Sequence, residues 1–204
     1  MLLEREEVNP DQAESKYSRT PLSVAAENGH ESVVKMLLER KEVNADQADT
    51  KYRKALWWAA RSGHEGVVKM LLERKDVNPG QADAKGGWTP LSLAADNGYG
   101  GIVKMLLEPE EVNLDQADTG YDRTPLSLAA DNGHEEVVKI LLEREKVNPD
   151  QPDTGHGRTP FSWAAWNGHE RVVKLLLQRE DVNSDGGGHS RWPNATLVGG
   201  RERA

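Results

Sequence analysis

Apolar positions along the chain keep a helical spacing that is repeated about five times. The clearest copy runs from Thr124 to Asn148, and the other copies begin at Thr20, Lys54, Thr89 and Thr159. A leucine or phenylalanine near the start of each copy recurs at intervals of 34, 35, 35 and 35 residues, at Leu22, Leu56, Leu91, Leu126 and Phe161. Repetition at this period indicates a solenoid, in which each unit covers the apolar side of its neighbour.

One copy predicts two short helices followed by a polar turn. Thr124 is a good N-cap, and Pro125 suits the first helical position because its missing N–H costs nothing there. Residues 126–130 place a leucine and two alanines on one helical face, and Gly133 can end this helix. Residues 135–142 have the apolar spacing of a second helix. The following stretch, rich in Pro, Asp and Gly, predicts a projecting turn or hairpin.

The motif T-P-L-x-x-A, with Gly-His between the two helices, resembles the ankyrin repeat. The resemblance covers roughly residues 1–183. It implies an all-α repeat solenoid of stacked helix-turn-helix units with projecting turns, no catalysis, and a partner protein bound on the concave face. The chain departs from the family after T-P-L, where the usual histidine is replaced by Ser23, Trp57, Ser92, Ser127 and Ser162. The turns are also longer than is usual in the family.

The repeats divide the chain into three regions. We expect a partial N-terminal repeat at residues 1–15, an array at 16–183 and a Gly-rich, disordered tail at 184–204. The expected units of the array are 16–49, 50–84, 85–119, 120–154 and 155–183. Because a terminal repeat needs a polar outer face, we also expect Trp192, Leu197 and Val198 of the tail to cover the last unit.

Two units are irregular. Lys54-Ala55 replaces Thr-Pro in the second unit, which predicts the loss of a helix cap, and Trp57-Trp58 adds bulk there. Gly100 and Gly101 open the second helix of the third unit. Because each glycine inside a helix costs up to about 1 kcal/mol, the third unit is predicted to be the least stable.

Composition narrows the choice of partner. The formal net charge is −8 and the pI is about 5.3, which argues against nucleic acid and anionic membranes. Hydrophobic residues make up only 36% of the chain, which suits a solenoid with a large solvent-exposed surface. Cysteine is absent, which is compatible with a reducing compartment. The longest apolar run, residues 55–60, is far shorter than the roughly 20 residues that span a membrane. We therefore expect a monomer in the cytoplasm or nucleus.

Two repeated features, a histidine and an acidic turn in successive units, could suggest metal binding, but neither has the arrangement that a metal site needs. Histidines recur in one slot, at His30, His64, His134 and His169. Equivalent points of stacked helices lie about 8–10 Å apart, whereas zinc holds nitrogen at about 2.0–2.1 Å, so we predict structural histidines that bond the turn between helices. The acidic turns are expected to be solvated, with an acidic docking ladder for a basic partner as the alternative. No catalytic motif occurs, so no enzyme, cofactor or metal is predicted.

Positions that vary between copies are the candidates for partner binding. The residues before Thr-Pro are Arg19, Arg53, Trp88, Arg123 and Arg158, and those after Ala-Ala are Glu27, Arg61, Asp96, Asp131 and Trp166. The resemblance places both rows on the concave face. Trp88 and Trp166 are the predicted main contacts, because Trp and Arg are enriched at binding hot spots. The alternative is that the arginines merely pair with the acidic row beside them, in surface pairs that contribute about 0–1 kcal/mol.

Aromatic residues in the turns, Tyr17, Tyr52, Tyr121 and His156, could add contacts, whereas Trp58 and Trp163 align with aliphatic residues and are expected to pack. The first hypothesis is therefore a non-catalytic module for protein–protein interaction. The alternative is a sensor or regulatory piece of a larger multidomain signalling protein, such as a NACHT-type receptor, because the chain opens in the middle of a unit.

Overall fold

The computed structural model describes residues 9–179 and 182, and this part of the chain holds ten α-helices and no strand. The helices are α1 (Pro21–Glu27), α2 (Glu31–Leu38), α3 (Ala55–Ser62), α4 (Glu65–Leu72), α5 (Pro90–Asp96), α6 (Gly100–Leu106), α7 (Pro125–Asp131), α8 (Glu135–Leu142), α9 (Pro160–Trp166) and α10 (Glu170–Leu177). Most of the expected partial N-terminal repeat, and the tail with Trp192, Leu197 and Val198, lie outside the described residues.

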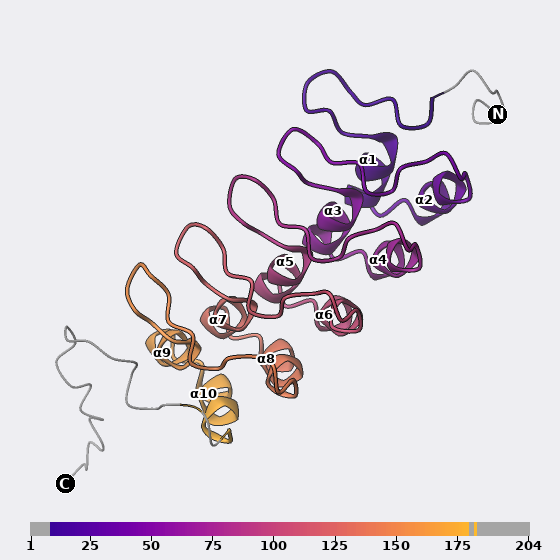
Figure 1. Ribbon diagram of the computed structural model, residues 1–204. Coiled ribbons are helices and arrows are strands. Elements are labelled where there is room, and N and C mark those ends of the chain that lie inside the picture. Colours follow the sequence, from indigo (N-terminus) through magenta and orange to yellow (C-terminus); the bar gives the residue numbers. More distant parts are fainter. Residues whose placement is uncertain (1–8, 180–181, 183–204) are drawn as a thin grey trace, which may run out of the picture.

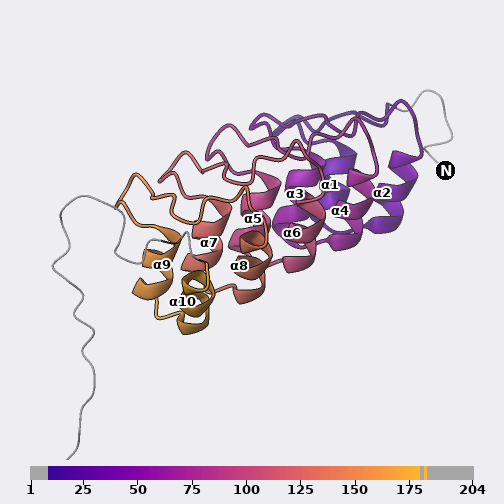
Figure 2. The same cartoon turned by 60° about the horizontal axis from the view of Figure 1, so that its bottom comes forward.

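The helices form two parallel rows with a row of loops beside them (Figure 1). The first helices of successive repeats, α1, α3, α5, α7 and α9, pack on one another, and the second helices, α2, α4, α6, α8 and α10, form the other row. The long loops between repeats project past the first helices and line one edge of the stack (Figure 2). The predicted all-α repeat solenoid is thus confirmed.

Four of the five first helices begin at the predicted threonine cap. The Oγ1 atoms of Thr20, Thr89, Thr124 and Thr159 accept the backbone N–H of the serine three residues later. At α5 the bond is reciprocal, because the Ser92 hydroxyl also accepts the N–H of Thr89 at 2.8 Å. The serine in the family's histidine slot therefore bonds within its own repeat. Helix α3 follows Lys54 and has no side-chain cap, as the sequence predicts.

The core runs unbroken through the described repeats. Leu22, Leu56, Leu91 and Leu126 of the first helices are at most 2% exposed. They join the paired alanines and the apolar face of the second helices in one cluster. Burying a side chain of this size contributes about 1.5–3 kcal/mol. Each repeat is thus stabilised mainly by its neighbours, as the period predicts.

The histidines that precede the second helices join adjacent repeats. Nε2 of His64 lies 3.0 Å from the carbonyl oxygen of Glu27, and His134 and His169 repeat this bond to Asp96 and Asp131 at 2.9 Å. The predicted structural role is confirmed for these three, but the bonded carbonyl ends the first helix of the preceding repeat. The ring also fills the space beside a glycine of the preceding repeat: a Cβ on Gly29 would lie 2.5 Å from Nδ1 of His64.

The loops are closed and stacked by backbone hydrogen bonds. In each loop the N–H of an acidic residue donates to the carbonyl of the residue before the helix cap, for example Asp118 to Arg123 at 3.1 Å. A second set of bonds joins one loop to the next, including Ala84 N–H to the Lys51 carbonyl at 2.9 Å. Loop residues of neighbouring repeats are therefore held in a fixed register.

The loop aspartates are structural, and the prediction that they are solvated is wrong for three of them. Asp49, Asp118 and Asp153 are at most 7% exposed. Their Oδ1 atoms accept two backbone N–H groups each, as in Asp118 with Gly120 at 2.9 Å and Tyr121 at 2.8 Å. Single-sequence reasoning misses this, because turn propensity does not say that the loops stack on one another.

Candidate binding groove

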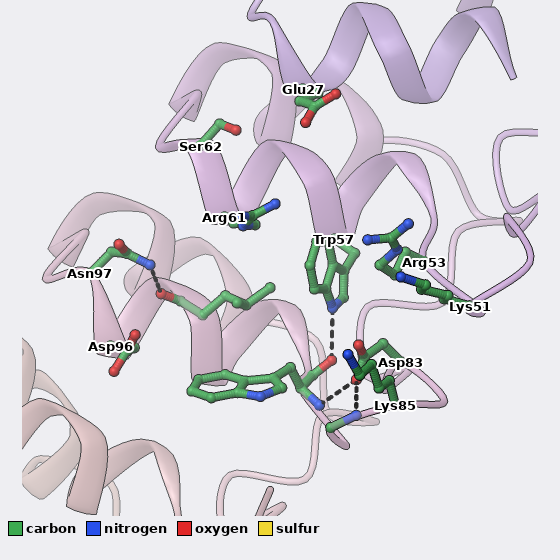
Figure 3. A pocket seen from close by; sticks show the side chains of 13 residues that line it. Glu27, Lys51, Arg53, Trp57, Arg61, Ser62, Asp83, Lys85, Asp96 and Asn97 are labelled. Atoms are coloured by element: carbon green, nitrogen blue, oxygen red, sulfur yellow. Dashed lines mark hydrogen bonds between the residues drawn. The ribbon is translucent and has the colours of Figure 1, made fainter. Parts of the chain in front are cut away.

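Repeats two and three form a groove of about 930 Å³ between their loops and first helices (Figure 3). The groove is lined by α3 and α5, by the loops that precede them, and by Glu27 at the end of α1. Its lining residues are Glu27, Lys51, Arg53, Trp57, Arg61, Ser62, Asp83, Lys85, Gly86, Trp88, Leu93, Asp96 and Asn97. Fixed loop register and packed helices place these side chains, so the groove is built into the scaffold.

Trp57, Trp88 and Leu93 form the apolar part of this groove, and Trp58 packs behind them. Trp57 and Trp58 of α3 are 6% and 4% exposed, and their rings meet edge to face with centroids 4.9 Å apart. Trp88 and Leu93 of the third repeat complete the cluster. Nε1 of Trp57 donates to the Trp88 carbonyl at 2.9 Å, which links the two repeats. The prediction that Trp58 packs is confirmed, whereas Trp57 both packs and lines the groove.

Two arginines, Arg53 and Arg61, lie near the Trp57 ring (Figure 3). The Arg53 guanidinium is 4.3 Å from the Trp58 ring centroid and also pairs with the buried Asp49 at 2.7 Å. The Arg61 guanidinium lies 5.7 Å from Trp57 and 5.5 Å from Trp58. Cation–π contacts of this kind contribute about 0.5–1 kcal/mol at exposed sites. The rings therefore hold both cations at the groove.

The second repeat lacks an ion pair that the first and fourth repeats make. In the first repeat Arg19 pairs with Glu27 at 2.7 Å, and in the fourth Arg123 pairs with Asp131 at 3.5 Å. The alternative that arginines pair with the adjacent acidic row is confirmed for these two. In the second repeat the acidic position is occupied by Arg61, so the groove gains a cation where the first and fourth repeats have an acid that neutralises an arginine.

The predicted site residues fall into separate groups. The groove brings together Glu27, Arg53, Arg61, Trp88 and Asp96. Arg19 instead lines a smaller neighbouring hollow of about 240 Å³ with Tyr17, Lys51, Arg53 and Trp58. The groove does not include Arg123, Asp131, Arg158, Trp166, Tyr121 or His156. Trp88 and Trp166, predicted as joint contacts, thus belong to different parts of the surface.

A second aromatic cluster lies at the last described repeat. The His156 ring lies 6.5 Å from Tyr121 and 6.3 Å from Trp163. Trp163 is half-buried, and its Nε1 donates to Asp153 at 2.9 Å. Trp166 is 64% exposed and stacks with the Arg158 guanidinium at 4.3 Å. Trp163 packs against its own loop, as expected, while Trp166 is the most exposed large apolar side chain of the described residues.

One groove carboxylate has a perturbed acidity. Burial raises the pKa of Asp96 above its usual range. The amide of Asn132 donates to its Oδ1 at 3.0 Å, which acts in the opposite direction but is the smaller effect. No group of three or more His, Cys, Asp or Glu in the described ranges could hold a metal ion. The groove can therefore contact a ligand through its aromatic rings and its charged side chains.

Sequence reasoning missed several lining residues. The sequence predicts only added bulk at Trp57, and it gives no signal that Lys51 and Lys85 line a groove. The signal for Trp57 was its place in the serine slot of the other repeats. The lysines carry no repeat signature, since only the stacking of two loops brings them together at the loop end of the groove (Figure 3).

The fold defines a helical repeat solenoid. Three copies of the family model for ankyrin repeats match residues 1–83, 41–118 and 91–185. The chain belongs to the ankyrin repeat family, whose members are generally protein–protein interaction modules and non-catalytic scaffolds. A search of curated proteins found no match. None of the described helices has the length and apolar character needed to cross a bilayer.

Proposed function

We propose that the chain is a non-catalytic module that binds a partner protein through the groove of repeats two and three. The observation that carries this proposal is the second repeat. Trp57 stands where the other four repeats have serine, and Trp58 and Arg61 stand where three of the other four have an aliphatic residue and an acid, respectively. These substitutions all face one groove or its neighbouring hollow. Trp and Arg are the residue types most enriched at binding hot spots.

The shape of the groove supports a segment of protein as the ligand. Ligand pockets for small molecules enclose most of the ligand within about 300–1,000 Å³. This groove has a similar volume, about 930 Å³, but is open along the loops and first helices. A protein partner that places one segment in the groove could extend over adjacent loops, reaching the roughly 800 Å² per partner of a standard interface.

Trp88 is the proposed central contact. It lines the groove at the position where the other four repeats have arginine. Its backbone is held by the Asp83 carboxylate, which accepts the Trp88 N–H at 2.9 Å, and by the bond from Trp57. A ring on a fixed backbone loses little conformational freedom on binding, which favours affinity. Trp166 is proposed as a separate, outlying contact.

The test compares three alanine variants in an affinity capture followed by mass spectrometry. Trp88→Ala is expected to abolish capture of the partner by the intact array while leaving the circular dichroism spectrum helical. Trp166→Ala should weaken capture less, because its ring lies outside the groove. Val33→Ala, which changes a 39% exposed residue on the second-helix row, is the control. Unchanged capture by Trp88→Ala would contradict the proposal.

A further inference from the structure

We propose that the segment bound in the groove is acidic, with carboxylates that pair with Lys51, Arg61 and Lys85. The inference rests on the proposed function, because it names the chemistry of the partner for the same groove. It is not evident from the chain as a whole, whose net charge of −8 would favour a basic partner. It follows from which charges of the groove are already paired.

The three cations have no carboxylate partner among the described residues. Lys51, Lys85 and Arg61 are exposed and make no ion pair within that part of the chain, and the Arg61 guanidinium lies over the Trp57 and Trp58 rings. The lysines come from successive loops that are joined by the Ala84–Lys51 backbone bond. Three cations from two repeats therefore line one groove without internal neutralisation.

The three acids of the groove, in contrast, are already engaged. Glu27 pairs with Arg19 at 2.7 Å. Asp83 accepts the N–H groups of Gly86 and Trp88 through Oδ1, at 3.0 and 2.9 Å. Asp96 is half-buried and accepts from the amide of Asn132. Glu27 is thus neutralised by a cation, whereas Asp83 and Asp96 keep their charge but are held by hydrogen bonds within the protein. The three cations without an ion pair outnumber these two carboxylates, so the charge left for a ligand is positive.

The negative charge of the rest of the molecule does not reach far into the groove. At physiological salt the Debye length is about 8 Å, so exposed acids on the second-helix row are largely screened. A carboxylate within contact distance of the lysines is screened much less. A nucleic-acid strand carries a charge on every phosphate, and where it extends beyond the groove it meets the acidic surface of a chain with a net charge of −8. A short acidic peptide is therefore the occupant that fits both the local and the overall charge.

The tryptophans add a requirement for an apolar residue beside the acidic ones. Trp57, Trp88 and Leu93 line the same groove as the cations. An aromatic or aliphatic side chain of the ligand would pack on Trp88 while flanking carboxylates reach the lysines of the loops. Apolar contact supplies most of the affinity in such interfaces, and charge supplies partner choice. The expected segment is acidic with an apolar residue within it.

The experiment selects peptides from a random display library on the full-length chain. Enriched peptides should contain more Asp and Glu than the library, together with aromatic or large aliphatic residues. One enriched peptide, labelled with fluorescein, then serves as the probe in fluorescence polarisation near physiological salt. Versions of it with Gln or Lys in place of each acidic residue test the role of charge directly. A single-stranded oligonucleotide of similar length tests the nucleic-acid alternative.

Matched charge reversals locate the binding. Lys51→Glu with Lys85→Glu should lower the affinity for the acidic probe about tenfold or more, because two contacts are lost and repulsion is added. Lys69→Glu with Lys75→Glu makes the same change in net charge at exposed residues outside the groove, and should weaken it less than about twofold. The groove reversal should also improve binding of the Lys version. If that variant does not fold, the neutral pair Lys51→Gln and Lys85→Gln should still weaken the acidic probe.

The outcomes separate this inference from the proposed function. Neutral or basic peptides that lose binding on Trp88→Ala would refute the acidic partner while supporting the groove. Acidic peptides that are indifferent to both Trp88→Ala and the lysine reversals, or no enrichment at all, would refute both proposals. An oligonucleotide that binds the groove more tightly than the selected peptide would also overturn the inference.

Discussion

The second and fourth repeats share the same pattern of two helices and a loop, but they differ in the residues at the start of the first helix and in the charges beside it. In the fourth, Thr124 caps α7, Ser127 is buried beside it, and Arg123 is neutralised by Asp118 and Asp131. In the second, the helix has no side-chain cap and two tryptophans and a second arginine occupy the equivalent places. The second repeat thus differs from the fourth in three ways: it lacks the helix cap, it carries two tryptophans in place of Ser127 and Leu128, and it has an arginine in place of Asp131.

The comparison shows that the second repeat lacks local interactions that stabilise the fourth. A missing cap costs about 1 kcal/mol, yet α3 is held by the buried Trp57 and Trp58 rings. Natural sequences violate local rules mainly at functional sites and compensate nearby. The groove lies where the rules are broken, which is the physical basis of the proposed function.

Replacing the same slot in the two repeats should give unequal losses. Trp57→Ala removes a buried ring and its bond to the Trp88 carbonyl, so we expect about 3–5 kcal/mol off the free energy of unfolding. Ser127→Ala, the matched change in the fourth repeat, loses one hydroxyl bond to Thr124 and should cost about 0.5–1.5 kcal/mol. Urea unfolding monitored by circular dichroism measures both. Equal losses would show that Trp57 is not a structural part of the groove.

Removing the cap residues should affect only the regular repeat strongly. Thr124→Ala is expected to cost about 1 kcal/mol, because its Oγ1 accepts the Ser127 N–H at 3.2 Å. Lys54→Ala removes no cap, and its ion pair with Asp46 contributes less than about 1 kcal/mol. Thermal melts of both variants provide the comparison. A larger loss for Lys54→Ala would mean that the second repeat depends on this ion pair.

The glycines of the third repeat should respond in opposite directions. Gly101 lies inside α6, so Gly101→Ala should raise the unfolding free energy by up to about 1 kcal/mol. The new Cβ would lie 2.1 Å from Glu65 Oε1, but this exposed carboxylate can turn away. Gly98 has a φ of +77°, and Gly98→Ala should therefore destabilise the protein. Destabilisation by both variants in urea unfolding would refute the prediction that the glycines of α6 weaken the third repeat.

Neutralising Asp96 should have the smallest effect. Burial raises its folded-state pKa against the opposing influence of Asn132, Arg123 and His134, and nearby Asp131 adds to the rise. A raised pKa means that the folded state binds the proton more tightly, so wild type loses stability as the pH rises through that value. Asp96→Asn should thus gain less than about 1 kcal/mol at pH 7. Melts repeated towards pH 4 should show this gain shrinking, and a constant or growing gain would contradict it.

The array could be predicted from the sequence because its signals are local. The recurrence of Leu126 and its equivalents fixes the period, and Thr124 with Pro125 fixes where a first helix starts. Trp88 could be placed in the binding row for the same reason, since it stands one residue before such a cap. These statements need only the spacing within one repeat.

The groove itself depends on contacts between repeats, which no single copy contains. Asp49 precedes Arg53 by four residues, whereas Asp118 precedes Arg123 by five, so the loop of the second repeat is one residue shorter. The stacking of this loop against the next brings Lys51 to the groove. Burial of the loop aspartates likewise follows from the stacked loops. Propensities and spacing do not report such long-range register.

The most direct test of the central claim follows the six tryptophan indole N–H signals by NMR while the selected peptide is added. The groove of repeats two and three predicts that the signals of Trp57 and Trp88 shift as the peptide saturates the protein, while those of Trp163 and Trp166 stay in place. Shifts confined to Trp163 and Trp166, with Trp57 and Trp88 unchanged, would contradict the account and place binding at the last repeat.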